Sequence, residues 1–168
     1  MHKIKSWFLF VFLFFISHVL WGQQRVSTSL SLTKIDFFHG FEYGQQHQAF
    51  EWNVGFEYGI NRSIFQKRFF PKLKTNGFYN FIHKPKFNIG IGTQYAYSLY
   101  RFGATTKDIT QFHEIMGGIR WNVGNKWKFG QTLMVGGLWE NDLHTLANKR
   151  QTYGTFGYLI QMEVSYAF

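Results

Sequence analysis

The stretch from Thr152 to Phe168 alternates between apolar and polar or small positions almost without interruption. Because successive side chains of a β-strand point to opposite faces, this alternation predicts a strand with one apolar face. The stretch exceeds the roughly ten residues of an ordinary globular strand and suits a tilted strand that crosses a membrane. A strand of a soluble sheet is the alternative. The apolar face carries Phe156, Tyr158, Ile160, Met162, Val164, Tyr166 and Phe168.

The same alternation recurs along the chain and predicts eight strands in all. The first is weakly marked, and the fourth contains Asn76-Gly77, which also fits a two-residue hairpin turn. A turn there would leave a return strand too short to cross a membrane, so a continuous fourth strand is preferred. The expected strands span residues 26–32, 35–44, 50–59, 70–82, 87–100, 109–123, 127–139 and 152–168.

The predicted connections differ in length on the two sides of the sheet. Short polar turns are expected at residues 45–48, 83–86 and 124–126, and longer polar loops at 61–68, 101–108 and 140–151. Short turns on one side and long loops on the other are typical of outer-membrane barrels, whose long loops face the outside of the cell.

The volume of a barrel decides which face of the strands points inward. An eight-stranded barrel is just wide enough to be filled by packed side chains. The apolar face is so rich in aromatic residues that it would overfill this space, whereas the Gly, Ala, Ser and Asn of the other face fit. We therefore expect an all-β transmembrane up-and-down barrel with aromatics outward, rather than a soluble barrel with aromatics inside. Girdle residues at the lipid boundaries would be Trp52, Tyr58, Tyr100, Trp121, Trp127, Trp139, Tyr158 and Tyr166.

The composition narrows the class further. The 168 residues suffice for one domain, and a mean hydropathy of −0.21 excludes a membrane protein built of many helices. Aromatic residues make up 21% of the chain and only two residues are Pro, which favours strands over disorder. The chain has no Cys, which excludes disulfides, thiolate metal sites and a lipid-anchored Cys.

The amino terminus has the pattern of a secretory signal peptide. Lys3 and Lys5 precede a short apolar run over residues 7–16, and Gly22 offers a small residue for cleavage. The alternative, a membrane anchor, would need about 20 apolar residues. We expect residues 1–22 to be a signal peptide and residues 23–168 to be the barrel domain.

Charged side chains fall mostly on the expected inward face, where an unpaired charge would be unfavourable. The inward acids are Asp36, Glu42, Glu51, Glu57, Glu114 and Glu163, and the inward bases are Lys72, Lys74, Arg120 and Lys128. We expect Arg120, Lys128 and Glu163, joined by Glu42 or Glu51, to form an ion-pair network that plugs the lumen. The alternative is separate hydration of each charge in a wider pore.

No pattern for catalysis, metal binding or a cofactor emerges from the mature chain. His113 and Glu114 are adjacent, so on a strand they point to opposite faces. His144 lies near Asp142 in the last expected loop, where a surface role is favoured. The histidines at 39, 47, 83 and 144 lack the spacing of metal ligands. We predict a protein without a cofactor that is not an enzyme.

The formal net charge is +9, and cations gather in the expected loops. A positive loop side suits lipopolysaccharide phosphates or another anionic partner, and a solvated surface is the alternative. Nucleic acid is not the expected partner, because the chain is exported and its strands have the apolar face of membrane-crossing strands. The predicted basic loop surface consists of Arg62, Lys67, Arg68, Lys149 and Arg150.

With its alternation, turn asymmetry and terminal Phe, the chain resembles small outer-membrane β-barrels of the OmpA and OmpX type. The resemblance implies an outer-membrane location among lipid and lipopolysaccharide. It also implies assembly by the barrel-insertion machinery, which reads a closing strand with Tyr166 and Phe168. The implied role is structural or surface-interacting, with a narrow channel and a lipid A-modifying enzyme as alternatives.

Overall fold

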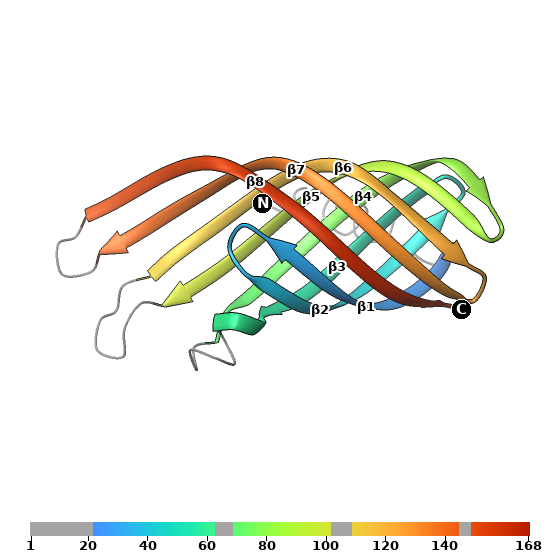
Figure 1. The fold of residues 1–168 in the computed structure, drawn as a ribbon, viewed down its shortest axis with the longest axis horizontal. Helices are drawn as coiled ribbons and strands as arrows, with labels where there is room; N and C mark the ends of the chain where they lie inside the picture. The colour runs from blue at the N-terminus through green and yellow to red at the C-terminus, as the bar shows by residue number, and fades with distance from the viewer. Residues whose placement is uncertain (1–21, 63–68, 102–108, 145–148) are drawn as a thin grey trace, which may run out of the picture.

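A computed structural model describes residues 22–62, 69–101, 109–144 and 149–168 and contains eight β-strands (Figure 1). Residues 1–21, which hold nearly all of the expected signal peptide, lie outside the described residues. Among those described, no helix is long and apolar enough to span a bilayer. The strands are β1 (Gln23–Thr33), β2 (Phe37–His47), β3 (Phe50–Gly59), β4 (Pro71–Lys84), β5 (Phe87–Arg101), β6 (Ile109–Gly124), β7 (Trp127–His144) and β8 (Lys149–Ala167).

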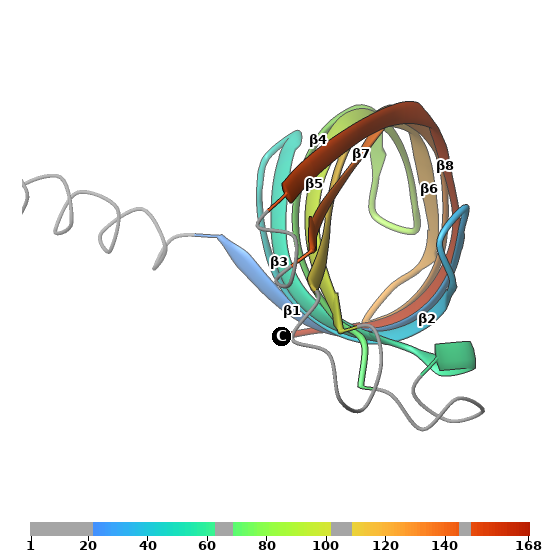
Figure 2. The ribbon, with the colours of Figure 1, turned by 90° about the vertical axis from the view of Figure 1, so that its left-hand side faces the viewer.

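Each strand pairs antiparallel with its neighbours in the sequence, and β8 pairs with β1 to close the barrel (Figure 2). We call the end with the β2–β3, β4–β5 and β6–β7 turns the turn end, and the opposite end the loop end. The start of β1 at Gln23 and the residue after β8, Phe168, both lie at the turn end. The predicted fold class, an all-β up-and-down barrel of eight strands, is confirmed.

The fourth strand is continuous. Asn76 pairs with Asn53 of β3 and with Gln94 of β5, and Gly77 pairs with Trp52 and Thr93 in the same two strands. A hairpin turn at Asn76-Gly77 is therefore wrong. With paired strands on both sides, the local turn preference of Asn-Gly is outweighed by ladder hydrogen bonds.

Side chains alternate between a buried interior and an exposed apolar wall, as predicted. Phe41 on β2 and Ile91 on β5 are more than half exposed, whereas the inward Glu57 and Lys72 are fully buried. Exposure of large apolar side chains around the whole barrel suits contact with lipid tails. Other outward residues are Val26, Leu30, Val54, Leu73, Ile115, Ile119, Phe129, Val135, Ile160 and Val164.

The strands differ in length, and this corrects the predicted last loop. Strands β1 to β3 have 10 or 11 residues, whereas β7 has 18 and β8 has 19. Most of residues 140–151 was expected to be loop but continues the β7–β8 ladder up to the pair His144 and Lys149. Strands β5 to β8 consequently rise past the others at the loop end (Figure 1). Residues 140–144 and 149–151 are mostly polar because this part of the sheet needs no apolar face where it has no lipid contact.

Candidate functional site in the barrel interior

Two arginines and two glutamates form a cluster in the barrel interior. The Arg25 guanidinium contacts the Glu51 carboxylate at 2.6 Å and the Glu163 carboxylate at 3.1 Å. Arg120 forms an ion pair with the other Glu51 oxygen, and its guanidinium lies 3.7 Å from the centre of the Phe78 ring. Glu51 therefore sits between two guanidinium groups that come from β1 and β6.

A second cluster lies nearer the loop end and is built around two lysines of β4. Lys74 Nζ contacts Glu42 at 2.9 Å and Glu57 at 2.5 Å. Lys72 Nζ lies 3.1 Å from Glu114 Oε2 and 3.5 Å from Glu57 Oε2. All five side chains are nearly inaccessible to solvent. Buried charges are tolerated in this arrangement because each has at least one opposite charge within contact distance.

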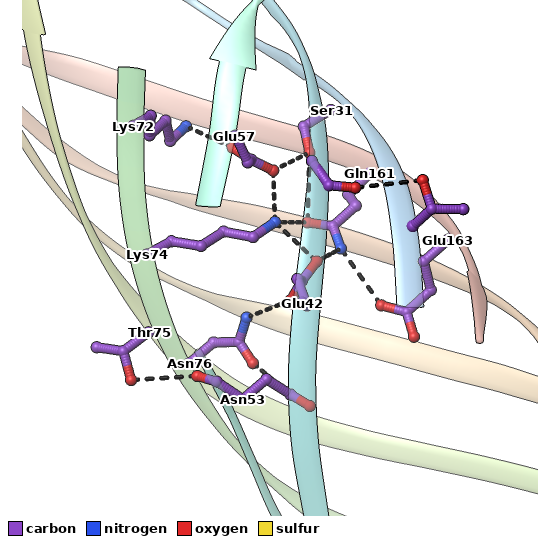
Figure 3. Close-up of polar contacts among 12 residues, drawn as sticks. Ser31, Glu42, Asn53, Glu57, Lys72, Lys74, Thr75, Asn76, Gln161 and Glu163 are labelled. Carbon is purple, nitrogen blue, oxygen red and sulfur yellow. Dashed lines mark hydrogen bonds and ion pairs between the residues drawn. The ribbon is translucent and has the colours of Figure 1, made fainter. Parts of the chain in front are cut away.

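Amide side chains join the two clusters into one network (Figure 3). The Gln161 amide nitrogen donates to Glu42 at 2.9 Å and to Glu163 at 3.3 Å, and its oxygen accepts from Lys74 at 2.9 Å. Asn53 accepts from Arg25 at 3.0 Å and donates to Asn76, which in turn donates to Glu42 at 3.3 Å. The network thus extends across the lumen from β1 to β4, β6 and β8.

The structure joins four of the five expected network residues: Arg120 and Glu51 pair directly, and Glu163 and Glu42 are linked to them through Arg25 and the amides. Arg120 contacts Glu51, and Glu163 contacts Arg25, so Arg120 and Glu163 are linked through the Arg25–Glu51 pair. Lys128, on β7, lies within 4 Å of no carboxylate among the described residues. Arg120 and Glu163 thus belong to one network, and among the described residues Lys128 makes no ion pair with it.

Arg25 is the contributor that sequence reasoning missed. It precedes the weakest predicted strand, where alternation was recognised only from Val26 onward. Arg25 stands two residues before the inward-facing Ser27, and residues two apart on a strand point to the same face. This spacing is the sequence signal that identifies Arg25 as an inward-facing residue. The sequence also predicts which other charges face inward but not which of them form ion pairs with one another, because ion pairing depends on the registers of several strands. These charges are Glu57, Glu114, Lys72 and Lys74.

Apart from the network, the interior holds two apolar groups in addition to buried polar side chains such as Asn80, Gln94 and Asn122. Beside the network, Phe78, Met116, Met134 and Leu159 pack together on the side of β4 and β6 to β8. At the loop end, a second buried group lies beside Lys72, whose ammonium is 4.4 Å from the Phe38 ring centre. This loop-end cluster consists of Phe38, Phe70, Tyr100, Phe112 and Leu138. The prediction of a small and polar interior is therefore incomplete.

Arg62 packs on this loop-end cluster instead of joining a solvated basic surface. Its guanidinium carbon lies 4.4 Å from the Tyr100 ring centre and 4.9 Å from that of Phe70. Its backbone N–H donates to Asp36 at 3.1 Å. Of the other predicted loop cations, Arg150 is exposed, and Lys67, Arg68 and the Lys149 side chain lie outside what the structure describes.

The end of the closing strand lies beside β1 and the β6–β7 turn. Phe168 N–H donates to Gln24 O at 3.0 Å, and the Tyr166 ring packs on Trp127 with centres 5.1 Å apart. The terminal aromatic side chains therefore face outward at the turn end, where an aromatic girdle is expected.

A threonine and a histidine meet on the outer face, which local sequence spacing did not predict. His39 Nε2 lies 3.0 Å from Thr28 Oγ1, and His39 Nδ1 lies 3.0 Å from the Tyr58 hydroxyl. The Thr28 hydroxyl also donates to Gly40 O at 3.2 Å. These contacts satisfy polar groups on a lipid-facing wall. No group of three or more potential metal ligands occurs in the described parts of the chain.

Comparisons with known proteins show a shared fold. No family model and no curated protein matches the sequence. The solved structure of outer membrane protein AlkL is 11% identical, with a TM-score of 0.50 over 88% of this chain and 90% of that one. A major outer membrane protein from Thermus thermophilus gives 0.48 at 7% identity, covering 88% and 100%, and Neisserial surface protein A gives 0.37 at 8%, covering 87% and 95%. The predicted resemblance to small outer-membrane barrels is confirmed at the level of the fold.

Proposed function

We propose that this chain is an integral barrel of the bacterial outer membrane with a sealed interior and a structural or surface-interaction role that involves no catalysis. The observation that carries the proposal is the buried network in which Arg25, Lys72, Lys74 and Arg120 are each paired with glutamates. Side chains joined across the lumen from opposite walls obstruct passage of solutes. They also tie non-adjacent strands together.

The exposed wall supports the membrane location. Aliphatic and aromatic side chains cover the outside of all eight strands, and Trp127, Tyr166 and Phe168 gather at the turn end. This arrangement suits outer-membrane lipid, with lipopolysaccharide in contact with the loop end. The closing strand with its terminal Phe168 would be read by the insertion machinery during assembly.

A narrow channel is the second candidate, and a specific feature of the interior favours it. Asn80, Gln94 and Asn122 each have a buried side-chain atom without a hydrogen-bond partner among the described residues. Such groups, outside the ion-paired network, are suited to solvating a small solute or ion.

Fractionation and conductance measurements distinguish these roles. We expect the protein in the outer-membrane fraction, with a gel mobility that shifts on boiling, and no stable conductance in planar bilayers. Absence of the heat shift, together with a soluble periplasmic protein, would contradict the membrane barrel. A heat shift with steady single-channel currents would instead favour the channel. Phe41 faces outward, so Phe41→Leu leaves the lumen unchanged. As a control, this variant should give the same heat shift and the same conductance result as the unmodified barrel.

A further inference from the structure

One edge of β8 is unpaired where this strand rises past β1. The pairing of β1 with β8 ends at Thr33 and Leu159, whereas the pairing of β7 with β8 continues to Lys149. Among the residues that the structure describes, 150–158 thus pair with β7 alone (Figure 1). We call residues 150–158 the free edge.

Hydrogen bonds at the other end of β8 show which backbone groups face the open side. Phe168 N–H donates to Gln24 of β1, and Ala167 N–H donates to Lys126, beside β7. Backbone groups alternate along a strand, and no irregularity interrupts either ladder of β8. The N–H and C=O groups of Gly154, Phe156 and the other even-numbered residues of the free edge therefore point away from β7. An unpaired row of this kind is a template for an added strand.

The free edge is accessible from both faces of the sheet. Every residue from Thr152 to Phe156 is exposed, whereas residues in the closed part of β8 alternate between buried and exposed. Tyr153 is 53% exposed and Phe156 is 62% exposed, on opposite faces. Proteins usually block such edges with Pro or charged residues, and the free edge has no Pro and one charge, Arg150.

We propose that the free edge binds an extended acidic segment of another protein as an additional strand. The inference rests on the proposed surface-interaction role and names the class of partner. Lys34 reaches the edge, with its ammonium 2.7 Å from the Thr155 hydroxyl, and Arg150 lies at the other end. Residues 149–162 contain no Asp or Glu, and the acids Glu140 and Asp142 of β7 stand opposite Tyr153 and Gln151 on the side of β8 away from the open edge. An added strand would therefore lie beside Lys34 and Arg150, so charge complementarity favours Asp or Glu in it.

A second copy in the same membrane does not fit this edge. All copies have the same orientation across the membrane, so an antiparallel β8–β8 pair would require one inverted barrel. Two copies related by a two-fold axis along the membrane normal cannot align their free edges for pairing either. Barrel strands tilt by about 35–45°, so the two edges would cross at about twice that angle. The partner strand must therefore come from a chain that is free to orient itself.

Substitutions at Gly154 test the proposal in the full-length barrel. Gly154→Pro removes an N–H directed to the open side while the bonds to β7, made by odd-numbered residues, are kept. Gly154→Ala is the matched control, since an added Cβ would come no closer than 3.6 Å to Trp139. The probes are labelled peptides of alternating Val and Thr that end in Glu, Gln or Lys, and binding is followed by fluorescence anisotropy. Exchange of backbone amides is measured in parallel.

The Glu-ended peptide should bind the unmodified barrel and Gly154→Ala equally, and Gly154→Pro about tenfold more weakly, which equals about 1.4 kcal/mol. The Lys-ended peptide should bind least. The backbone amide hydrogens of Gly154 and Phe156 should exchange rapidly in the free barrel and slowly when the Glu-ended peptide is bound. Two binding results would overturn the proposal: equal binding to Gly154→Pro, or preference for the Lys-ended peptide. It would also be overturned if none of the peptides bound, or if these amides were already protected from exchange in the free barrel. Because the heat shift is recorded for every variant, its loss would identify failure of the membrane barrel itself.

Discussion

Arg25 contacts carboxylates that come from two different strands, and both carboxylates are buried. Arg25→Ala should therefore lower the free energy of unfolding by about 3–5 kcal/mol, since removal of one partner leaves buried charge uncompensated. Urea unfolding in detergent, followed by the gel mobility shift, measures this change. Lys128→Ala removes an inward cation that has no carboxylate within 4 Å in the described part of the chain, and it should have a smaller effect. Equal loss in the two variants would contradict the assigned pairing.

Arg62 illustrates a residue whose role depends on its surroundings. With its guanidinium over the Tyr100 and Phe70 rings, Arg62→Ala should cost about 0.5–2 kcal/mol of stability. The exposed Arg150 packs on no aromatic ring among the described residues, and Arg150→Ala is the matched comparison. If the temperature of the gel shift falls equally in both variants, or in neither, the ring contacts do not stabilise the barrel.

At the scale of elements, the β6–β7 turn depends on one backbone conformation. Gly124 has φ of +134°, and a Cβ there would lie 2.0 Å from Trp127 O. Gly124→Ala should destabilise the barrel by about 1–3 kcal/mol because L-residues rarely adopt this conformation. Refolding yield and urea unfolding are the measurements, with Gly154→Ala as a control of the same chemical change. A Gly124→Ala barrel that unfolds at the same urea concentration as the control would show that the turn adapts.

Strand existence followed from local alternation, whereas strand ends did not. The expected second strand began at Ile35, but residues 34–36 form the connection between β1 and β2, in which Thr33 N–H donates to Asp36 O at 3.1 Å. Residues 140–144 were expected in a loop because they are polar, yet they pair with β8. Polar residues indicate contact with water, but they do not indicate whether the backbone is paired. Strands that extend beyond the membrane are polar and still form ladder hydrogen bonds.

At the scale of the whole molecule, the topology predicts which residues face outside the cell. Because the chain has no Cys, single-cysteine variants give labelling without background. Thr152→Cys at the loop end should react with a membrane-impermeant maleimide in intact cells, and Asn125→Cys at the turn end should react only after the outer membrane is disrupted. Both positions are exposed, so accessibility to reagent is matched. The reverse pattern would mean that the barrel is inserted with its loop end in the periplasm.

The class of the fold and the direction of nearly every strand side chain follow from the amino-acid pattern alone. Alternation has a period of two, so it assigns faces locally, and the limited volume of an eight-stranded barrel places the aromatic face outside. Which inward charges meet depends instead on the closed barrel. The pairing of Arg25 with Glu51 and Glu163 requires β1 to close against β8 at one particular register. Contacts between distant strands depend on that closure, which no local pattern encodes.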